Sequence, residues 1–558
     1  MSGEDKELSL LLSEINEDNS IRLMKKFNKI MRWVIADFPK FVSHKYPDKH
    51  GLIYYGFNNV ENKYTYKELD SLSNRFANFL IENGLKDYDR VAIHSFNSDY
   101  FVISMFGTYK AKGVLVPINY LLTGKDVIYQ INNSESKFYL LDDSFYSQIK
   151  DVLPEFNYVK KFVALNKKDK INNEKFVDFN DILKNYSDKE PDKILNIWDP
   201  VTIMYTSGTE SLPKGVIHTN QSLIAEYVSS IISGRFENRD VVIHALPLYH
   251  TAQKDVFLVP YVWLGATNIV LPKGDIQLIM EAIQKYKANS MFAPPTVWIG
   301  IVNHPDFKKY DLSSIEKIYY GAAIMPVEVL NRLRKEFPNA KFVNYYGQTE
   351  LAPAHTALLP EDHDIKPGTA GKELLNMMTE LMDEQGNIIK EPYKAGEIVG
   401  RGPHTMIGYL KNPEKTMEAF KYDWFHSGDI GMWDKDHYLY VIDRKKDMIK
   451  TGGENVSSRE VEEVIYKHPA VKEVAVIGLP DEKWIEKVTA VVVLKDNYEK
   501  SEELKKEIME FARNNLAHFK APKEIIFVDS LPKSPSGKIL KRELREQFKS
   551  RKEFKEKM

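Results

Sequence analysis

The chain has 558 residues, of which 43% are hydrophobic and 28% are charged, and its formal charge is -2. This composition is typical of a globular protein with roughly three to four domain-sized units, and the near-balanced charge argues against a global attraction to nucleic acid or anionic membranes. Because there is no cysteine, disulfides, thiolate nucleophiles and cysteine-ligated metals are excluded.

Residues 1–28 are predicted to form a polar or helical extension. They lack the apolar core of a secretory signal, so the sequence favours a cytoplasmic location. The longest candidate membrane stretch, residues 256–271, contains Pro260 and Gly265 and is shorter than the roughly 20 residues that a spanning helix needs. We therefore expect a buried helix and strand there, and no transmembrane segment.

The first regular element is a helix that begins at a capping-box pattern of Thr65 and Glu68. Apolar residues follow at helical spacing as far as Leu80, and Gly84 stands where a C-cap is expected. A short apolar run at 91–93 then predicts a strand. The same helix-then-strand alternation recurs, with further strands predicted at 162–165, 241–243 and 269–271. This pattern predicts an α/β fold with largely buried sheets.

A second, smaller unit is expected after the charged, glycine-containing stretch 443–453. Ser457 and Glu460 form another capping-box pattern, which opens a helix over 459–467 that Pro469 ends. Strands are predicted at 474–477 and 488–494, and a helix at 502–516. The expected organisation is therefore a large domain over 29–443 and a small α+β domain over 444–558.

The strongest chemical motif is the loop at 205–215, which follows a predicted strand at 201–204. Its small hydroxyl residues and Gly208 allow backbone N–H groups to form an anion nest, and Lys214 adds a positive charge for phosphate. The alternative is an ordinary polar surface loop. The spacing differs from the Walker pattern, since Lys214 is neither preceded by glycine nor followed by serine or threonine.

A second cluster, residues 344–350, follows an apolar run at 341–343. One of its tyrosines is suited to stack on a purine, Thr349 to donate to a phosphate, and Glu350 to hold Mg²⁺ through oxygen. The alternative is a strand end with core tyrosines and an exposed acid.

Three further clusters are weaker when each is taken alone. At 424–429, Asp429 follows a glycine and is suited to accept both hydroxyls of a ribose, although a turn acid is commoner. The charged residues 443–447 resemble an ordinary linker. At 532–542, a Pro/Ser/Gly loop presents Lys538 just before a basic helix, and the alternative is a solvated basic tail.

The joint occurrence of these motifs in this order resembles the adenylate-forming superfamily of acyl-CoA synthetases, luciferases and peptide-synthetase adenylation domains. The resemblance covers about residues 38–545 and is strongest to the fatty-acyl-CoA ligases, which residues 452–456 and 519–523 also match. It implies a large domain of packed sheets and helices with a small mobile C-terminal domain. The implied substrates are ATP, CoA and a carboxylic acid, with Mg²⁺ as the metal.

The resemblance also implies roles for individual residues. The residues that it assigns to ATP or AMP are Thr206, Ser207, Gly208, Thr209, Glu210, Lys214, Gly321, Ala322, Ala323, Tyr345, Tyr346, Gly347, Gln348, Thr349, Asp429, Arg444 and Lys538. Those implied to be catalytic are Lys214, Thr349, Glu350 and Lys538, with Glu350 on the metal. Lys446 matches the family's hinge, and Gly452, Gly453 and Glu454 would face CoA. One departure stands out, because the commoner loop reads Thr-Thr-Gly where this chain has Thr209-Glu210-Ser211.

A mechanism follows from this resemblance and from charge. The acid is already ionised at pH 7, since model carboxyl groups have a pKa of about 4 to 5, so no general base is required. Lys214, Lys538 and Mg²⁺ would neutralise charge at the α-phosphate while acyl-adenylate and pyrophosphate form. CoA would then displace AMP, after the small domain swings about Lys446.

The acid itself is expected to bind near Tyr249, His250, Thr296, Val297, Trp298 and Gly347. Acetate-specific relatives carry tryptophan where this chain has Gly347, which favours a short- to long-chain fatty acid longer than acetate. A small hydroxy acid, such as a hydroxybutyrate, is a second candidate. The sequence also leaves open an amino-acid or aryl-acid adenylating enzyme, a luciferase and a non-catalytic acyl-adenylate-binding protein. The oligomeric state stays open, with a homodimer among the options.

Overall fold

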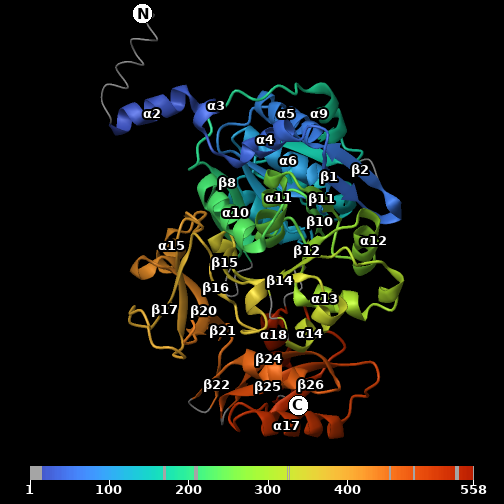
Figure 1. The fold of residues 1–558 in the computed structure, drawn as a ribbon, viewed down its shortest axis with the longest axis vertical. Coiled ribbons are helices and arrows are strands. Elements are labelled where there is room, and N and C mark those ends of the chain that lie inside the picture. Colours follow the sequence, from blue (N-terminus) through green and yellow to red (C-terminus); the bar gives the residue numbers. More distant parts are fainter. Residues whose placement is uncertain are drawn as a thin grey trace, which may run out of the picture.

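A computed structural model describes residues 16–166, 171–206, 212–322, 325, 327–451, 454–481, 484–533 and 539–556. Within these residues the chain forms four sheets with helices packed between and around them (Figure 1). The helices other than short 3-10 turns are α2 (Glu17–Lys26), α3 (Asn28–Met31), α4 (Phe38–Lys45), α5 (Tyr66–Glu82), α6 (Asp99–Lys110), α7 (Gly124–Ser134), α8 (Tyr146–Ile149), α9 (Phe179–Asn185), α10 (Asn220–Gly234), the π-helix η5 (Ala252–Leu258), α11 (Val259–Leu264), α12 (Ile276–Tyr286), α13 (Pro295–Asn303), α14 (Val327–Glu336), α15 (Pro413–Ala419), α16 (Ser458–Tyr466), α17 (Glu502–Asn515) and α18 (Lys541–Glu556).

Two large mixed sheets form the body of the molecule. In the described residues sheet A has nine strands, in the order β16 (Lys372–Glu373), β15 (Ala354–Leu358), β14 (Lys341–Gly347), β13 (Lys317–Gly321), β12 (Ser290–Phe292), β10 (Val241–His244), β11 (Thr267–Val270), β1 (His50–Tyr55) and β2 (Glu61–Thr65). Sheet B has eight in the same described part, in the order β19 (Gly408–Tyr409), β9 (Lys214–Thr219), β8 (Pro200–Thr206), β4 (Val114–Ile118), β3 (Arg90–His94), β5 (Phe138–Asp142), β6 (Lys161–Leu165) and β7 (Phe176–Asp178).

Two smaller sheets complete the fold. Sheet C joins β17 (Met378–Met382), β18 (Gly396–Arg401), β20 (Phe425–Trp433) and β21 (Leu439–Arg444). Sheet D joins β23 (Glu454–Val456), β22 (Ile449–Thr451), β25 (Ile485–Leu494), β24 (Val471–Asp481) and β26 (Glu524–Phe527). Sheet D and α17 lie below the body in Figure 1, in orange and red, and α16 and α18 pack on β24 of this sheet.

The hydrophobic core joins the two large sheets. Its largest cluster includes Leu52 and Val270 of sheet A and Val91 and Leu115 of sheet B, together with side chains of the helices between them, α5, α6 and α10. Sheet D has a core of its own around Val476 and Val492. The predicted α/β class is thus confirmed.

Local sequence signals account for many of the elements. The Thr65–Glu68 capping box is present and opens α5, and Gly84 follows that helix with a positive φ of 86°. The apolar stretch 256–271 forms part of η5, then α11 and β11, as expected for a buried segment. In the described part of the chain, no helix is long and apolar enough to cross a membrane.

The prediction of a second capping box, formed by Ser457 and Glu460, is wrong. Ser457 does cap α16 by accepting from the Glu460 backbone N–H, but the Glu460 carboxylate does not return to the cap. It binds the Lys520 ammonium instead, at 2.7 Å. The helix also spans Ser458–Tyr466 rather than 459–467.

Candidate active site

The predicted phosphate loop lies between two paired strands of sheet B. Thr206 is the last residue of β8 and lies opposite Lys214, the first residue of β9, in an antiparallel register. The predicted phosphate contacts Ser207, Gly208, Thr209 and Glu210 lie outside the described residues. The Lys214 ammonium lies 4.2 Å from the centre of the Tyr409 ring and therefore interacts with its π face.

Thr349 and Glu350 lie in the short 3-10 turn that follows β14, and two buried side chains position this turn. The Tyr409 hydroxyl donates a hydrogen bond of 2.9 Å to Glu350 Oε1. His218 donates from Nε2 to the Thr349 carbonyl at 2.7 Å. Burial lowers the pKa of His218 to about 4, so the imidazole is neutral near pH 7. The turn is thus tied to two strands of sheet B, through His218 of β9 and Tyr409 of β19.

His218 and Tyr409 were missed in the sequence. Tyr409 lies on the two-residue strand β19, which pairs with β9 almost 200 residues earlier, so Tyr409 and Lys214 meet only through the sheet. His218 is a lone histidine in an apolar strand, a pattern more typical of a core residue. The Gly408-Tyr409 pair gives no local signal of a site.

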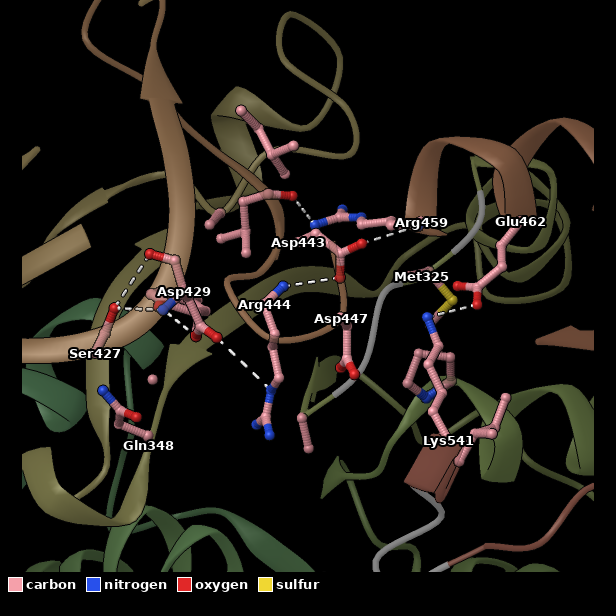
Figure 2. Close-up of a pocket in the computed structure, with 18 of the residues that line it drawn as sticks. Met325, Gln348, Ser427, Asp429, Asp443, Arg444, Asp447, Arg459, Glu462 and Lys541 are labelled. Atoms are coloured by element: carbon pink, nitrogen blue, oxygen red, sulfur yellow. Dashed lines mark hydrogen bonds and ion pairs between the residues drawn. The ribbon is translucent and has the colours of Figure 1, made fainter. Parts of the chain in front are cut away.

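The predicted ribose residues come together on sheet C. Asp429 of β20 and Arg444 of β21 are directly opposite in the antiparallel register, and Arg444 Nε lies 3.6 Å from Asp429 Oδ1. The Tyr346 hydroxyl donates to Asp429 Oδ2 at 2.8 Å. Figure 2 shows Asp429 held between Ser427 and Arg444, with Gln348 nearby. A planar tyrosine, a carboxylate and a guanidinium therefore line one part of the cavity.

Tyr345 faces away from this group. Consecutive residues of a strand point to opposite faces, and the Tyr345 hydroxyl lies 3.0 Å from Ser233 Oγ of α10 and 3.3 Å from the Ser230 carbonyl, to which it donates. The Tyr345 hydroxyl therefore lies on the other side of β14 from Asp429, although Tyr345 lines the same cavity, and its expected contact with the nucleotide stays a prediction.

Two glycines at the strand ends permit close backbone packing. A Cβ on Gly347 would lie 1.9 Å from the Pro353 carbonyl oxygen, and a Cβ on Gly321 would lie 2.4 Å from the Tyr345 carbonyl oxygen. Both positions thus exclude any side chain. Ala322 follows Gly321 with a positive φ of 61° and lines the cavity, whereas Ala323 is outside the described residues.

Four of the six residues predicted for the acyl pocket line the same cavity as the ribose group: Tyr249, His250, Thr296 and Gly347. Val297 and Trp298 are not among the residues that line it. The role of these residues in binding the acid stays a prediction. Trp298 is fully buried in the core on the far side of α13, and its indole N–H donates to the Tyr319 carbonyl at 3.1 Å.

The predicted hinge region is rich in specific contacts. Asp443 Oδ2 accepts from the backbone N–H of Ser458 at 2.7 Å and from its hydroxyl at 2.6 Å. Arg545 of α18 binds Asp447 at 2.7 Å. Desolvation and the nearby positive charge of Arg444 lower the pKa of Lys446 to about 8.

The start of α18 is anchored to the same helix that Asp443 caps. Lys541 binds Glu462 at 2.7 Å, as Figure 2 shows, and it also donates to Ser458 Oγ at 2.6 Å. Of the predicted CoA residues, Glu454 is exposed on β23. Gly452, Gly453 and the predicted catalytic Lys538 lie outside the described residues.

Comparison with known proteins places this geometry in a family. Residues 40–410 match the AMP-binding enzyme model and residues 460–538 match the AMP-binding enzyme C-terminal domain. The long-chain-fatty-acid–CoA ligase of Bacillus subtilis is 32% identical over 551 residues, which cover 93% of this chain and 95% of that protein. The 4-hydroxybutyrate–CoA ligase 2 of Metallosphaera sedula is 32% identical over 524 residues, which cover 91% of this chain and 93% of that protein.

One relative has been solved in two states. The ATP-bound structure of MatB from Rhodopseudomonas palustris is 29% identical, covers 92% of this chain and 99% of its own, and gives a TM-score of 0.82. The apo structure of the same protein, at the same coverage, gives a lower TM-score of 0.73. The arrangement of this chain is therefore closer to the ATP-bound form. With the family model matching most of its length, the chain belongs to the AMP-binding, adenylate-forming family of enzymes.

Proposed function

We propose that the protein is an ATP-dependent carboxylate–CoA ligase that forms acyl-CoA, AMP and pyrophosphate through an acyl-adenylate. The observation that carries this proposal is the Asp429–Arg444–Tyr346 group, which shares one cavity with Lys214, Glu350 and an apolar pocket. The relatives named above are CoA ligases. A cytoplasmic location is part of the proposal, since ATP and CoA are intracellular metabolites.

In the first step, the residues of sheets B and C would bind and orient ATP. Asp429 would accept the ribose hydroxyls, with its carboxylate oriented by the Tyr346 hydroxyl and the Arg444 guanidinium. Thr349, in the turn after β14, and Lys214, at the start of β9, would contact the phosphates, and Lys538 would join them at the α-phosphate. Fixed positive charge is the main requirement, because two anions must be brought together.

Glu350 is suited to hold Mg²⁺ together with the ATP phosphates. It lines the cavity, and only one of its carboxylate oxygens is bonded to Tyr409. In the described residues no cluster of three or more acidic or histidine side chains forms a metal cage. One carboxylate plus substrate phosphates is the usual way in which proteins hold Mg²⁺, and the bound ion would neutralise phosphate charge.

The second step would require the unit built on sheet D to move. Lys446, between β21 and β22, is the proposed hinge, and the proposed domains are 29–443 and 444–558. Rotation there would withdraw Lys538 and bring Gly452, Gly453 and Glu454 to the adenylate, where CoA attacks. The alternation between two such arrangements follows the general behaviour of hinged domains.

The rival function of amino-acid adenylation is disfavoured by one contact. Such an enzyme needs an acid to hold the substrate's amino group, and Asp255 is the acid nearest in sequence to the Tyr249–His250 segment. Asp255 is fully buried and paired with the Lys254 ammonium at 2.6 Å, so it is committed to the core.

The test is turnover of ATP to AMP with CoA across linear acids from acetate to palmitate, together with 4-hydroxybutyrate. Formation of AMP, pyrophosphate and acyl-CoA in equal amounts is expected. Pyrophosphate release with no acyl-CoA formed would contradict the ligase and favour a stand-alone adenylating enzyme.

A further inference from the structure

The two faces of β14 serve different parts of the cavity. Tyr346 points toward sheet C and binds Asp429, whereas Tyr345 points to the opposite face, toward α10. The Tyr345 ring, together with Phe257 of η5 and Phe292 of β12, lines the cavity on that face. These three rings form an aromatic wall.

The aromatic wall is continuous and buried. Phe257 and Phe292 stack with ring centres 4.5 Å apart, and Phe257 meets Tyr345 edge-on at 6.0 Å. Their exposed fractions are 1% for Phe257, 3% for Phe292 and 7% for Tyr345. Rings packed in this way leave no passage for a flexible chain between them.

Tyr345 is also held in place from behind. Its hydroxyl is hydrogen-bonded to Ser233 and Ser230 of α10. A Cβ added to Gly234 would lie only 2.8 Å from that hydroxyl, so the helix backbone packs directly against it.

A second layer of aromatic rings lies behind the aromatic wall. Tyr319 lies next to Tyr345, with ring centres 6.3 Å apart, and donates its own hydroxyl to the Gly234 carbonyl at 2.7 Å. Phe236 and Tyr261 complete that layer and are stacked at 4.3 Å. The pocket therefore ends at Tyr345 on this side, because other rings fill the space behind Tyr345 and the hydroxyls of Tyr345 and Tyr319 are hydrogen-bonded.

We infer that the aromatic wall, in which Phe257 lies between Phe292 and Tyr345, closes the acyl pocket on this side of β14 and restricts this enzyme to a short-chain acid. The inference rests on the proposed ligase function and narrows its substrate class. The room for the acid on this face of β14 ends at Tyr345, whose ring lines the cavity and whose hydroxyl is bonded to α10. An acid with a long alkyl chain would have to displace a ring that is bonded at its hydroxyl and packed on its face.

The first experiment measures kcat/KM of the unaltered protein for linear acids from acetate to palmitate. We expect a maximum among the short acids and a steep fall beyond it. A maximum at palmitate would overturn the inference, since the chain would then leave by another route, such as the face of α13 at Ile299, which also lines the cavity. No acyl-CoA from any acid would instead contradict the ligase function itself.

The second experiment compares Tyr345→Ala with Tyr345→Phe. Removing the ring should move the maximum to longer acids, with a gain of about fourfold in kcat/KM for each methylene that becomes buried. Tyr345→Phe keeps the ring and should keep the maximum where it is. An unchanged maximum in Tyr345→Ala would overturn the inference.

A matched control separates the pocket from the stability of its core. Phe236→Ala removes a ring of the same aromatic cluster that does not line the cavity, so the preferred chain length should not change. Thermal unfolding of each variant shows which of them folds. If Tyr345→Ala does not fold, Tyr345→Leu opens a smaller space and should still shift the maximum, and failure of that shift would count against the aromatic wall.

Discussion

The Asp443–Ser458 contact joins sheet C to the helix that packs on sheet D. Asp443 belongs to sheet C, whereas Ser458 begins α16, which packs on sheet D. Two short bonds, 2.7 and 2.6 Å, join the Asp443 carboxylate to Ser458, and the carboxylate also lies at the positive end of a helix. Asp443→Asn should replace charge-assisted bonds with neutral ones and cost this arrangement about 2 kcal/mol, or about thirtyfold in population.

This arrangement resembles the ATP-bound state of the solved relative more than its apo state. We therefore expect Asp443→Asn to slow adenylate formation, measured by exchange of pyrophosphate into ATP, by up to about thirtyfold. Thioester formation from supplied acyl-adenylate and CoA should be unchanged or faster, because the opposite arrangement becomes easier to reach. The ratio of the two rates is the quantity to compare.

The control for this variant is Glu460→Gln. Glu460 lies on the same helix but binds Lys520 within the sheet D unit, so its loss should leave the ratio unchanged. The reasoning is refuted if Asp443→Asn slows both half-reactions equally, or if Glu460→Gln alters the ratio as strongly.

Four further outcomes are expected. Lys538→Ala should largely abolish adenylate formation and spare thioester formation from supplied acyl-adenylate, and equal loss of both would remove Lys538 from the first step. Lys446→Pro should impair the thioester step more than adenylation, and unchanged CoA transfer would argue against the hinge. Tyr409→Phe removes the hydrogen bond to Glu350, and a hydrogen bond to a charged group is worth about 1.5 to 3 kcal/mol. The pyrophosphate-exchange rate should therefore fall by about tenfold or more. A rate within twofold of that of the unaltered protein would contradict the role of the Glu350 contact. In the folded protein His218 has a pKa of about 4, below its unfolded value of about 6.5. The free energy of unfolding should therefore fall by about 3 kcal/mol for this group as the pH drops from about 6.5 to about 4. Urea unfolding across that range should show a smaller pH dependence in His218→Gln.

Local signals in the sequence were sufficient where neighbouring residues decide the structure. The Thr65–Glu68 box opens a helix because both bonds lie within one turn. The same pattern at Ser457 and Glu460 is incomplete, because Lys520, 60 residues away, binds the glutamate more effectively. A pattern of four residues carries no information about such a distant competitor.

The candidate site shows the same difference between residues that local motifs indicate and residues that distant contacts decide. Asp429, Arg444, Thr349 and Glu350 occur in motifs with several polar residues together, and the family resemblance of those motifs predicted one shared site; the four do line one cavity. Trp298 could not be assigned a face, since nearly all of its helix is apolar and tertiary packing alone decides which side meets the cavity.

The neighbours Tyr345 and Tyr346 lie on opposite faces of one strand and contact different layers of the protein. Alternation along β14 requires that the two tyrosines face opposite sides. Tyr346 meets Asp429 and Tyr345 meets α10, so in the proposed function a single strand would separate recognition of ATP from recognition of the acid. Substitution of Tyr346 should therefore act on KM for ATP and substitution of Tyr345 on the choice of acid. Because the two side chains share no contact, the chain-length preference can change without any change at the ribose group.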